Sequence, residues 1–453
     1  MSKNKNKKML RCGAPISGAL IAAMGLLAPG MAVAQDAGDP PVLFIDVFTG
    51  LSYEDNLNRP DEVEATTGFA VGYFTSTHDQ RLSFQTGVTA RGREDDFDFI
   101  DPFVTIAYAR FNRDFEIGGD LSYRRTQIDG TNIGDDFDAD DLDREDGSRE
   151  DIDFGLRLVT GRASPFGTDT QLRYSESNFF DGATTDDSVT TTARSTLRFT
   201  VDPRIELTLS GFWEQEETDD AVNTVDTTTR LIFGADLAID QVWSASAGLG
   251  VARVETETTG GTKTEDGPEG FFVLTRDLPN GGLVFSTNHV VTDDGWRNSV
   301  RVRRTIERAN GDLFDASIGQ IFFEEGGSGH LASLDYSRTT RTGFMSVGLD
   351  YSSDLDGADL LVQRTRLNAS LRGDLTDDSG WSLDGSMARV DYDNPATNDA
   401  VRFDVGVAYL HGLSNDWNLA ARVQHQVLYE DGNLDDRTNV FSLNLERRFS
   451  VRP

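Results

Sequence analysis

The sequence is poor in the residues that would allow disulfides, metal centres or membrane-spanning helices. It has one cysteine, Cys12, so it cannot form an internal disulfide framework or a cysteine metal site. From Gln35 onward it contains no apolar run of about 18 residues, which excludes a transmembrane helix. Lysine is nearly absent as well, since Lys263 is the only lysine after Lys8.

The chain is strongly acidic. It carries 76 Asp and Glu against 42 Lys and Arg, a formal net charge of -34. The first 34 residues hold five of the cations and no acid, so the remaining 419 residues (453 minus 34) have a net charge of -39. A chain of this charge repels phosphate backbones, and we expect no nucleic-acid partner.

The N-terminus has the three regions of a secretory signal peptide. Basic residues occupy positions 3–11, an apolar stretch follows over 16–27, and Ala32-Val33-Ala34 forms a cleavage motif. Cys12 precedes the apolar stretch, so it is not placed as a lipoprotein acylation site. The sequence predicts a signal peptide over 1–34 and one mature domain over 35–453.

The mature chain alternates apolar and polar residues almost throughout. Leu231, Phe233 and Leu237 share one parity, with Arg230 and Asp236 on the other. A period of two gives a strand one apolar and one polar face. The apolar faces could meet between two sheets of a secreted sandwich or solenoid, or turn outward to lipid from a closed barrel.

Composition favours the barrel. Apolar content is only 38%, yet the chain has 28 Phe, 10 Tyr and 5 Trp. A transmembrane barrel needs polar side chains on half of each strand because its interior is wet. The sequence therefore predicts an all-β protein, a single antiparallel transmembrane up-and-down β-barrel in the outer membrane of a Gram-negative bacterium.

Connections between the strands alternate in length, as they do in such barrels. Short turns are expected at 76–80, 111–114, 163–167, 201–204, 240–241, 279–281, 309–312, 341–342, 376–379 and 413–416. Longer acidic loops are expected at 54–63, 94–98, 129–149, 179–187, 218–226, 258–269, 394–399 and 431–436. The count gives about 18 to 22 strands, with 22 the best value, periplasmic turns and extracellular loops.

If the apolar parity faces lipid, most charged residues of the strands face the lumen. Two arginine groups stand out because few acids share their parity nearby: Arg297, Arg301 and Arg303 on a strand over 296–308, and Arg364, Arg366 and Arg372 on another. They are candidate pore-lining residues. The alternative is cross-strand ion pairing that only solvates and stiffens the wall.

Other chemistry has little support in the sequence. The acid run over 135–146 could attract calcium, but the position that requires glycine in a calcium loop is Asp146, so a solvated outer loop is the better interpretation. The five histidines lack metal-ligand spacing, and no nucleophile motif is present. We expect no catalytic site, metal or cofactor.

An early strand ends in Gly50-Leu51-Ser52-Tyr53-Glu54-Asp55-Asn56-Leu57. This Y-x-D-N ending, followed by arginine-rich hairpins, resembles the β-barrel porin type 2 group of proteobacterial outer-membrane proteins. The resemblance implies a setting in exopolysaccharide synthesis or export. The last strand, over 437–449, ends in an aromatic residue and resembles the signal read by the barrel assembly machinery, although four residues follow it.

These observations predict an outer-membrane channel for polar solutes, with exopolysaccharide as one candidate. Its expected partners are outer-membrane lipid, lipopolysaccharide and the barrel assembly machinery. The alternative is a structural or adhesive surface barrel without transport.

Overall fold

The computed structural model describes residues 41–93, 96–129, 146–180, 185–324, 327–355, 360–393, 399–414 and 417–451. The predicted signal peptide lies outside these residues. In the described part every regular element is a strand. No helix there is long and apolar enough to cross a membrane.

Twenty-two strands follow one another along the chain, which confirms the best count from the sequence. They are β1 Val42–Asn56, β2 Glu62–Ser76, β3 Gln80–Arg93, β4 Asp96–Phe111, β5 Phe115–Asp129, β6 Asp146–Thr160, β7 Phe166–Phe180, β8 Ser188–Asp202, β9 Ile205–Thr218, β10 Thr224–Ala238, β11 Trp243–Thr258, β12 Gly261–Leu278, β13 Gly281–Thr292, β14 Gly295–Glu307, β15 Leu313–Phe323, β16 Ser328–Thr340, β17 Gly343–Leu355, β18 Leu361–Thr376, β19 Ser379–Tyr392, β20 Ala400–Gly412, β21 Trp417–Glu430 and β22 Asn433–Val451.

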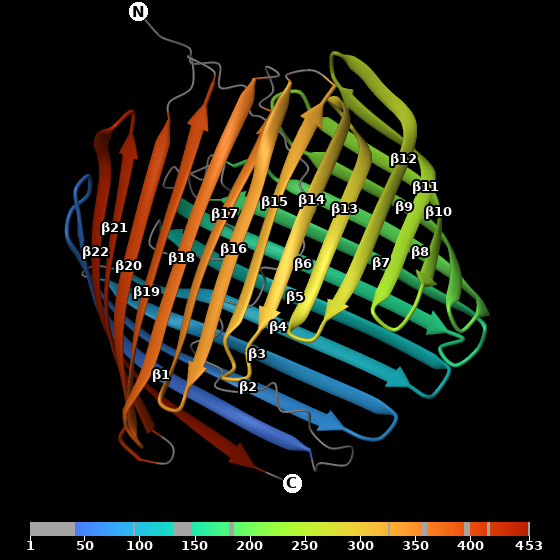
Figure 1. The fold of residues 1–453 in the computed structure, drawn as a ribbon. Coiled ribbons are helices and arrows are strands. Elements are labelled where there is room, and N and C mark those ends of the chain that lie inside the picture. Colours follow the sequence, from blue (N-terminus) through green and yellow to red (C-terminus); the bar gives the residue numbers. More distant parts are fainter. Residues whose placement is uncertain are drawn as a thin grey trace, which may run out of the picture.

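The strands form one closed antiparallel barrel (Figure 1). Each strand pairs with the next in sequence, and β1 pairs with β22 from Leu43 opposite Val451 to Asn56 opposite Thr438. The predicted fold class is confirmed. Because the number of strands is even, β1 begins and β22 ends at the same rim, that of the short turns.

Large apolar side chains are exposed on one face of the wall. Leu231 is 51% exposed, Phe233 56% and Phe441 48%, whereas Ile232 and Val440, on the opposite parity, are only partly exposed. In a closed barrel every strand has two bonded neighbours, so the backbone is satisfied without water and this apolar face can lie in lipid. The protein is an outer-membrane barrel of a Gram-negative bacterium.

Two predicted loops are wrong in extent. The segment 258–269 is mostly strand, because β11 and β12 continue as a hairpin from Thr258 opposite Gly261. The segment 431–436 contains a tight turn in which Asp431 has a φ of 48° and Gly432 a φ of 76°, after which β22 begins. Two positive φ values in an Asp-Gly pair are typical of a two-residue hairpin turn.

A β-bulge in β4 changes which parity faces outward. Asp101 has a φ of 51°, and the β3–β4 register shifts between Gly87 and Thr89. Before the bulge Phe97 and Phe99 are exposed, and after it the even-numbered Ile106 and Tyr108 are. Pro102, which lacks an N–H, follows Asp101 where the ladder is already interrupted.

Candidate functional site

The inner wall of the barrel is the candidate functional site. With strand spacings of about 4.8 Å and a tilt of about 40°, 22 strands enclose a backbone cylinder of about 22 Å radius. Side chains of about 7 Å cannot fill that width. Every described residue belongs to the wall or to a connection between strands, so the described part of the chain contains no separate plug domain.

An ion pair identifies the concave face. Arg297 on β14 lies 3.6 Å from Asp354 on β17, although β15 and β16 run between them. On a flat sheet three strand spacings would separate the two backbones by about 14 Å. The contact is possible because curvature brings side chains together on the inside, so the polar parity faces the lumen.

The β14 arginines differ from one another. Arg303 Nε lies 2.7 Å from Asp315 Oδ1, and Arg297 is held by Asp354. Arg301 stands opposite Ser286 and Gly319 and has no ion pair within the described residues. The expectation that these arginines lack acidic neighbours is therefore wrong for Arg297 and Arg303.

The β18 arginines also differ in whether an acidic residue lies nearby. Arg364 Nη1 lies 3.7 Å from Asp354 Oδ2, so Asp354 joins the two arginine groups. Arg366 stands opposite Asp350 across the β17–β18 ladder. Arg372 is exposed and makes no ion pair in the part of the chain that the structure describes.

Much of the remaining wall is a lattice of cross-strand ion pairs, as the alternative interpretation expects. Examples are Arg157 with Asp169 at 2.7 Å, Arg230 with Glu269 at 3.2 Å and Arg448 with Asp46 at 2.6 Å. Within the described residues some inner-wall cations remain outside this lattice. They are Arg173, Arg194, Arg301, Arg372 and Arg422.

The Y-x-D-N ending of β1 lies at the seam with β22. Asn56 Nδ2 donates to Thr438 Oγ1 at 2.7 Å, and its Oδ1 accepts from the Asn58 backbone N–H. Asn439 Nδ2 donates to Asp55 at 2.9 Å. The tyrosine hydroxyl of the motif donates to Asp61. These residues close the barrel and begin the first loop, which accounts for the motif structurally.

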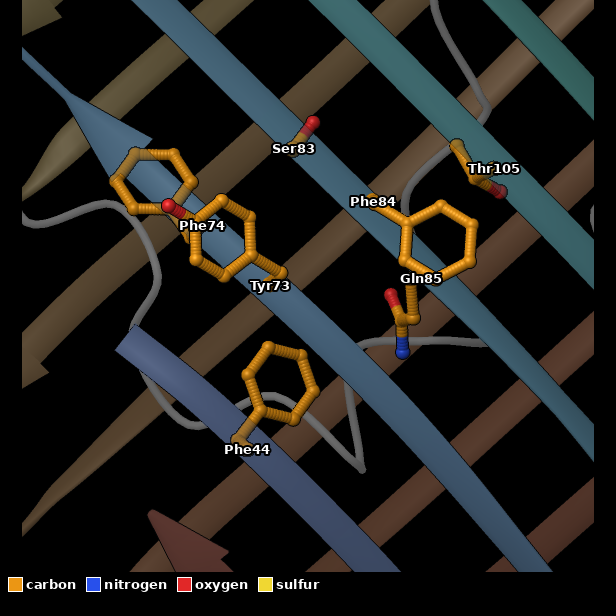
Figure 2. Close-up of a pocket in the computed structure, with 7 residues that line it drawn as sticks. All are labelled: Phe44, Tyr73, Phe74, Ser83, Phe84, Gln85 and Thr105. Atoms are coloured by element: carbon orange, nitrogen blue, oxygen red, sulfur yellow. The ribbon is translucent and has the colours of Figure 1, made fainter. Parts of the chain in front are cut away.

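Beside the seam, the inner wall of β1 to β4 is aromatic. The rings of Phe44, Phe48 and Phe103 lie over Gly72, Gly68 and Gly87 on the neighbouring strands, where a Cβ would collide with them. Figure 2 shows a hollow beside these rings, lined by Phe44, Phe74, Ser83, Gln85 and Thr105 of the inward parity together with Tyr73 and Phe84, which have the opposite parity. Ion pairs border these rings, because Asp46 on β1 pairs with Arg448 and Glu64 on β2 lies 3.7 Å from Arg91 on β3.

The described residues contain no cluster of histidine, cysteine or carboxylate groups suited to a metal ion. The acid run over 135–146 lies outside the residues whose side chains are described. Two histidines have amide partners: His289 Nδ1 is 2.6 Å from Asn298 Oδ1, and His425 Nδ1 is 2.7 Å from Asn439 Oδ1.

One carboxyl in the β13–β14 connection is electrostatically unusual. Burial raises the pKa of Asp293 above its ordinary range because removal from water disfavours the charged form. The nearby Asp226 carboxylate raises this pKa further, whereas Lys263 lowers it.

No family model and no curated protein matches the chain, so the resemblance to the β-barrel porin type 2 group is not confirmed. Solved structures do match. The FrpB iron transporter from Neisseria meningitidis has a TM-score of 0.60 at 11% identity, over 89% of this chain and 82% of that one. A variant of the ferric enterobactin receptor from Pseudomonas aeruginosa has a TM-score of 0.59 at 11% identity, over 91% and 81%. These matches establish the fold.

Proposed function

We propose that the protein is an outer-membrane transport barrel that conducts polar solutes through its lumen. The observation that carries this proposal is a closed 22-stranded wall with a charged inner face. A wall this wide encloses more space than its own side chains fill, and its polar lining is compatible with water and hydrated solutes. Transport requires no reactive group, so this function is not enzymatic.

Two solute classes remain within the proposal. The Y-x-D-N resemblance suggests an exopolysaccharide, and the serine hydroxyls and arginines of the inner wall can hydrogen-bond neutral or anionic sugars. The structural neighbours are named as an iron transporter and a ferric enterobactin receptor, which suggests ferric chelates. At 11% identity the similarity establishes a shared fold and does not show that this chain binds the same ligand.

The experiment is single-channel recording in planar bilayers with cysteine-substituted protein. The predicted mature chain contains no cysteine. Ser333→Cys places a thiol on the inner face of β16, where Ser333 contacts Ser317, and Leu334→Cys places one on the lipid face. A bulky charged thiol reagent should lower the conductance of the Ser333 variant and leave that of the Leu334 variant unchanged.

Absence of conductance, with heat-modifiable mobility showing that the barrel is folded, would contradict the channel and favour the structural or adhesive alternative. Saturable binding of a ferric chelate to a barrel without conductance would favour a receptor. Equal effects of the reagent on both variants would contradict a solute path along this inner face.

A further inference from the structure

One row of inward residues crosses four neighbouring strands near the short-turn rim. Arg372 on β18 stands opposite Ser382 on β19, Ser382 opposite Ala408 on β20, and Ala408 opposite Arg422 on β21. Arg372 lies four residues before the end of β18, and Arg422 lies five after the start of β21. The row therefore lies in the periplasmic third of the wall.

Both arginines are outside the ion-pair lattice of the described residues. Arg422 leans toward β20, since its guanidinium atoms lie 3.3 to 3.8 Å from the position that a Cβ on Gly406, the inward residue next to Ala408, would occupy. With strand spacings of about 4.8 Å, the Arg372 and Arg422 backbones are about 14 Å apart. An arginine side chain is about 7 Å long, so a group held over Ser382 and Ala408 lies within reach of both arginines.

The centre of the row contains an unsatisfied polar atom. Ser382 is only 2% exposed, and among the described residues its Oγ has no hydrogen-bond partner. A buried hydroxyl without a partner is costly, and a ligand oxygen could accept a hydrogen bond from it. Two acids flank the row at the next inward positions, Asp374 on β18 and Asp384 on β19, and Ser370 donates to Asp384 at 2.7 Å. Two cations and two carboxylates therefore lie in this part of the wall.

We propose that Arg372, Ser382 and Arg422 form a subsite for an oxyanion group of a solute, such as a carboxylate, sulfate or phosphate. The two guanidinium groups supply forked donors from either side, and the Ser382 hydroxyl supplies a third donor between them. As a step in transport the subsite rests on the proposed channel. Its binding can be measured without conductance.

The test is equilibrium dialysis of the detergent-solubilised full chain with inorganic phosphate, and with sulfate and acetate as competitors. Arg372→Gln and Arg422→Gln should each weaken phosphate binding by about tenfold, since each removes a charge-assisted donor. Ser382→Ala should weaken it by a smaller factor. Arg389→Gln is the matched control, because it removes a cation paired with Asp391 on the other parity, outside the lumen.

Heat-modifiable mobility would establish that each variant is folded. Competition by sulfate but not by acetate would identify a tetrahedral oxyanion, and competition by all three would identify oxyanions in general; both support the subsite. Failure of phosphate to bind, or equal binding by the Arg372→Gln and Arg389→Gln proteins, would overturn it. Binding without conductance would overturn the channel alone, and conductance without binding would overturn the subsite alone.

Discussion

Removal of Arg448 should weaken the barrel where it closes. Arg448 Nε and Nη2 donate to the two oxygens of Asp46 at 2.6 and 2.7 Å, joining β22 to β1. The guanidinium also lies 5.1 Å from the centre of the Phe44 ring. Asp46 is only 8% exposed, so Arg448→Ala would leave a carboxylate with little water and no counter-charge.

The size of the effect follows from this geometry. Breaking a fully buried pair costs about 3 to 5 kcal/mol. The Arg448 side chain is 36% exposed, however, so solvent screens the interaction and we expect about 2 kcal/mol, including the lost contact with Phe44. Arg389→Ala is the control, because its partner Asp391 is 31% exposed and such surface pairs contribute less than about 1 kcal/mol.

The assay is urea unfolding in lipid vesicles, followed by tryptophan fluorescence and by the heat-modifiable gel shift. A double-mutant cycle with Asp46→Asn isolates the pair, and its coupling energy should exceed about 1 kcal/mol. If Arg448→Ala lost no more stability than Arg389→Ala, or if the cycle gave no coupling, the seam ion pair would not stabilise closure.

Three further predictions concern topology, selectivity and pH. Lys263 lies at the tip of the β11–β12 hairpin and its side chain is 56% exposed, so it should react with a membrane-impermeant amine reagent on intact cells. Lys263→Arg should abolish that label. Labelling only after permeabilisation would mean that the loop rim faces the periplasm. Replacing Arg297, Arg301 and Arg303 together with Ala should shift the reversal potential in a salt gradient toward cation selectivity. The triple variant removes three positive charges and also leaves the Asp354 and Asp315 carboxylates without these ion-pair partners. An unchanged potential would show that these groups do not face the solute path. Asp293→Asn should raise the melting temperature at neutral pH. The raised pKa of Asp293 means that protonation favours the folded state, and this stabilisation is lost as pH rises through the pKa. The difference in melting temperature between the two proteins should close at acid pH, and a pH-independent difference would contradict a titrating Asp293.

The strands and turns were predictable because each follows from local rules. A lipid-facing strand must show its apolar side chains at every second position, as Leu231 and Phe233 do, and reversals need residues suited to turns. The β11–β12 hairpin escaped prediction because both its faces are polar near the tip, so no alternation marks it. The Asp431–Gly432 turn carried a usable signal in its Asp-Gly pair.

The pairing on the inner wall could not be predicted from one sequence. Arg297 and Asp354 are separated by two intervening strands, and their contact depends on the curvature of the closed wall and on the register of three successive ladders. The row that joins Arg372 to Arg422 likewise appears only when three registers are known. The parity of a residue along its strand identifies the face on which its side chain lies. The residues that the side chain contacts on other strands depend on the registers and the curvature of the whole barrel.

The seam between β1 and β22 also differs from the other ladders in chain entropy. Every other ladder joins strands that are neighbours in sequence, whereas Leu43 meets Val451 near the opposite end of the chain. The free-energy cost of closing a loop grows by about 0.6 kcal/mol for each doubling of its length, so this junction costs about 4 kcal/mol more than a hairpin. The side-chain bonds of Asn56 and Asp46 occur on that ladder and offset the cost. A circular permutant that joins residues 42 and 451 and opens the chain in the turn at Asp240 would move this entropic cost to a ladder without those bonds.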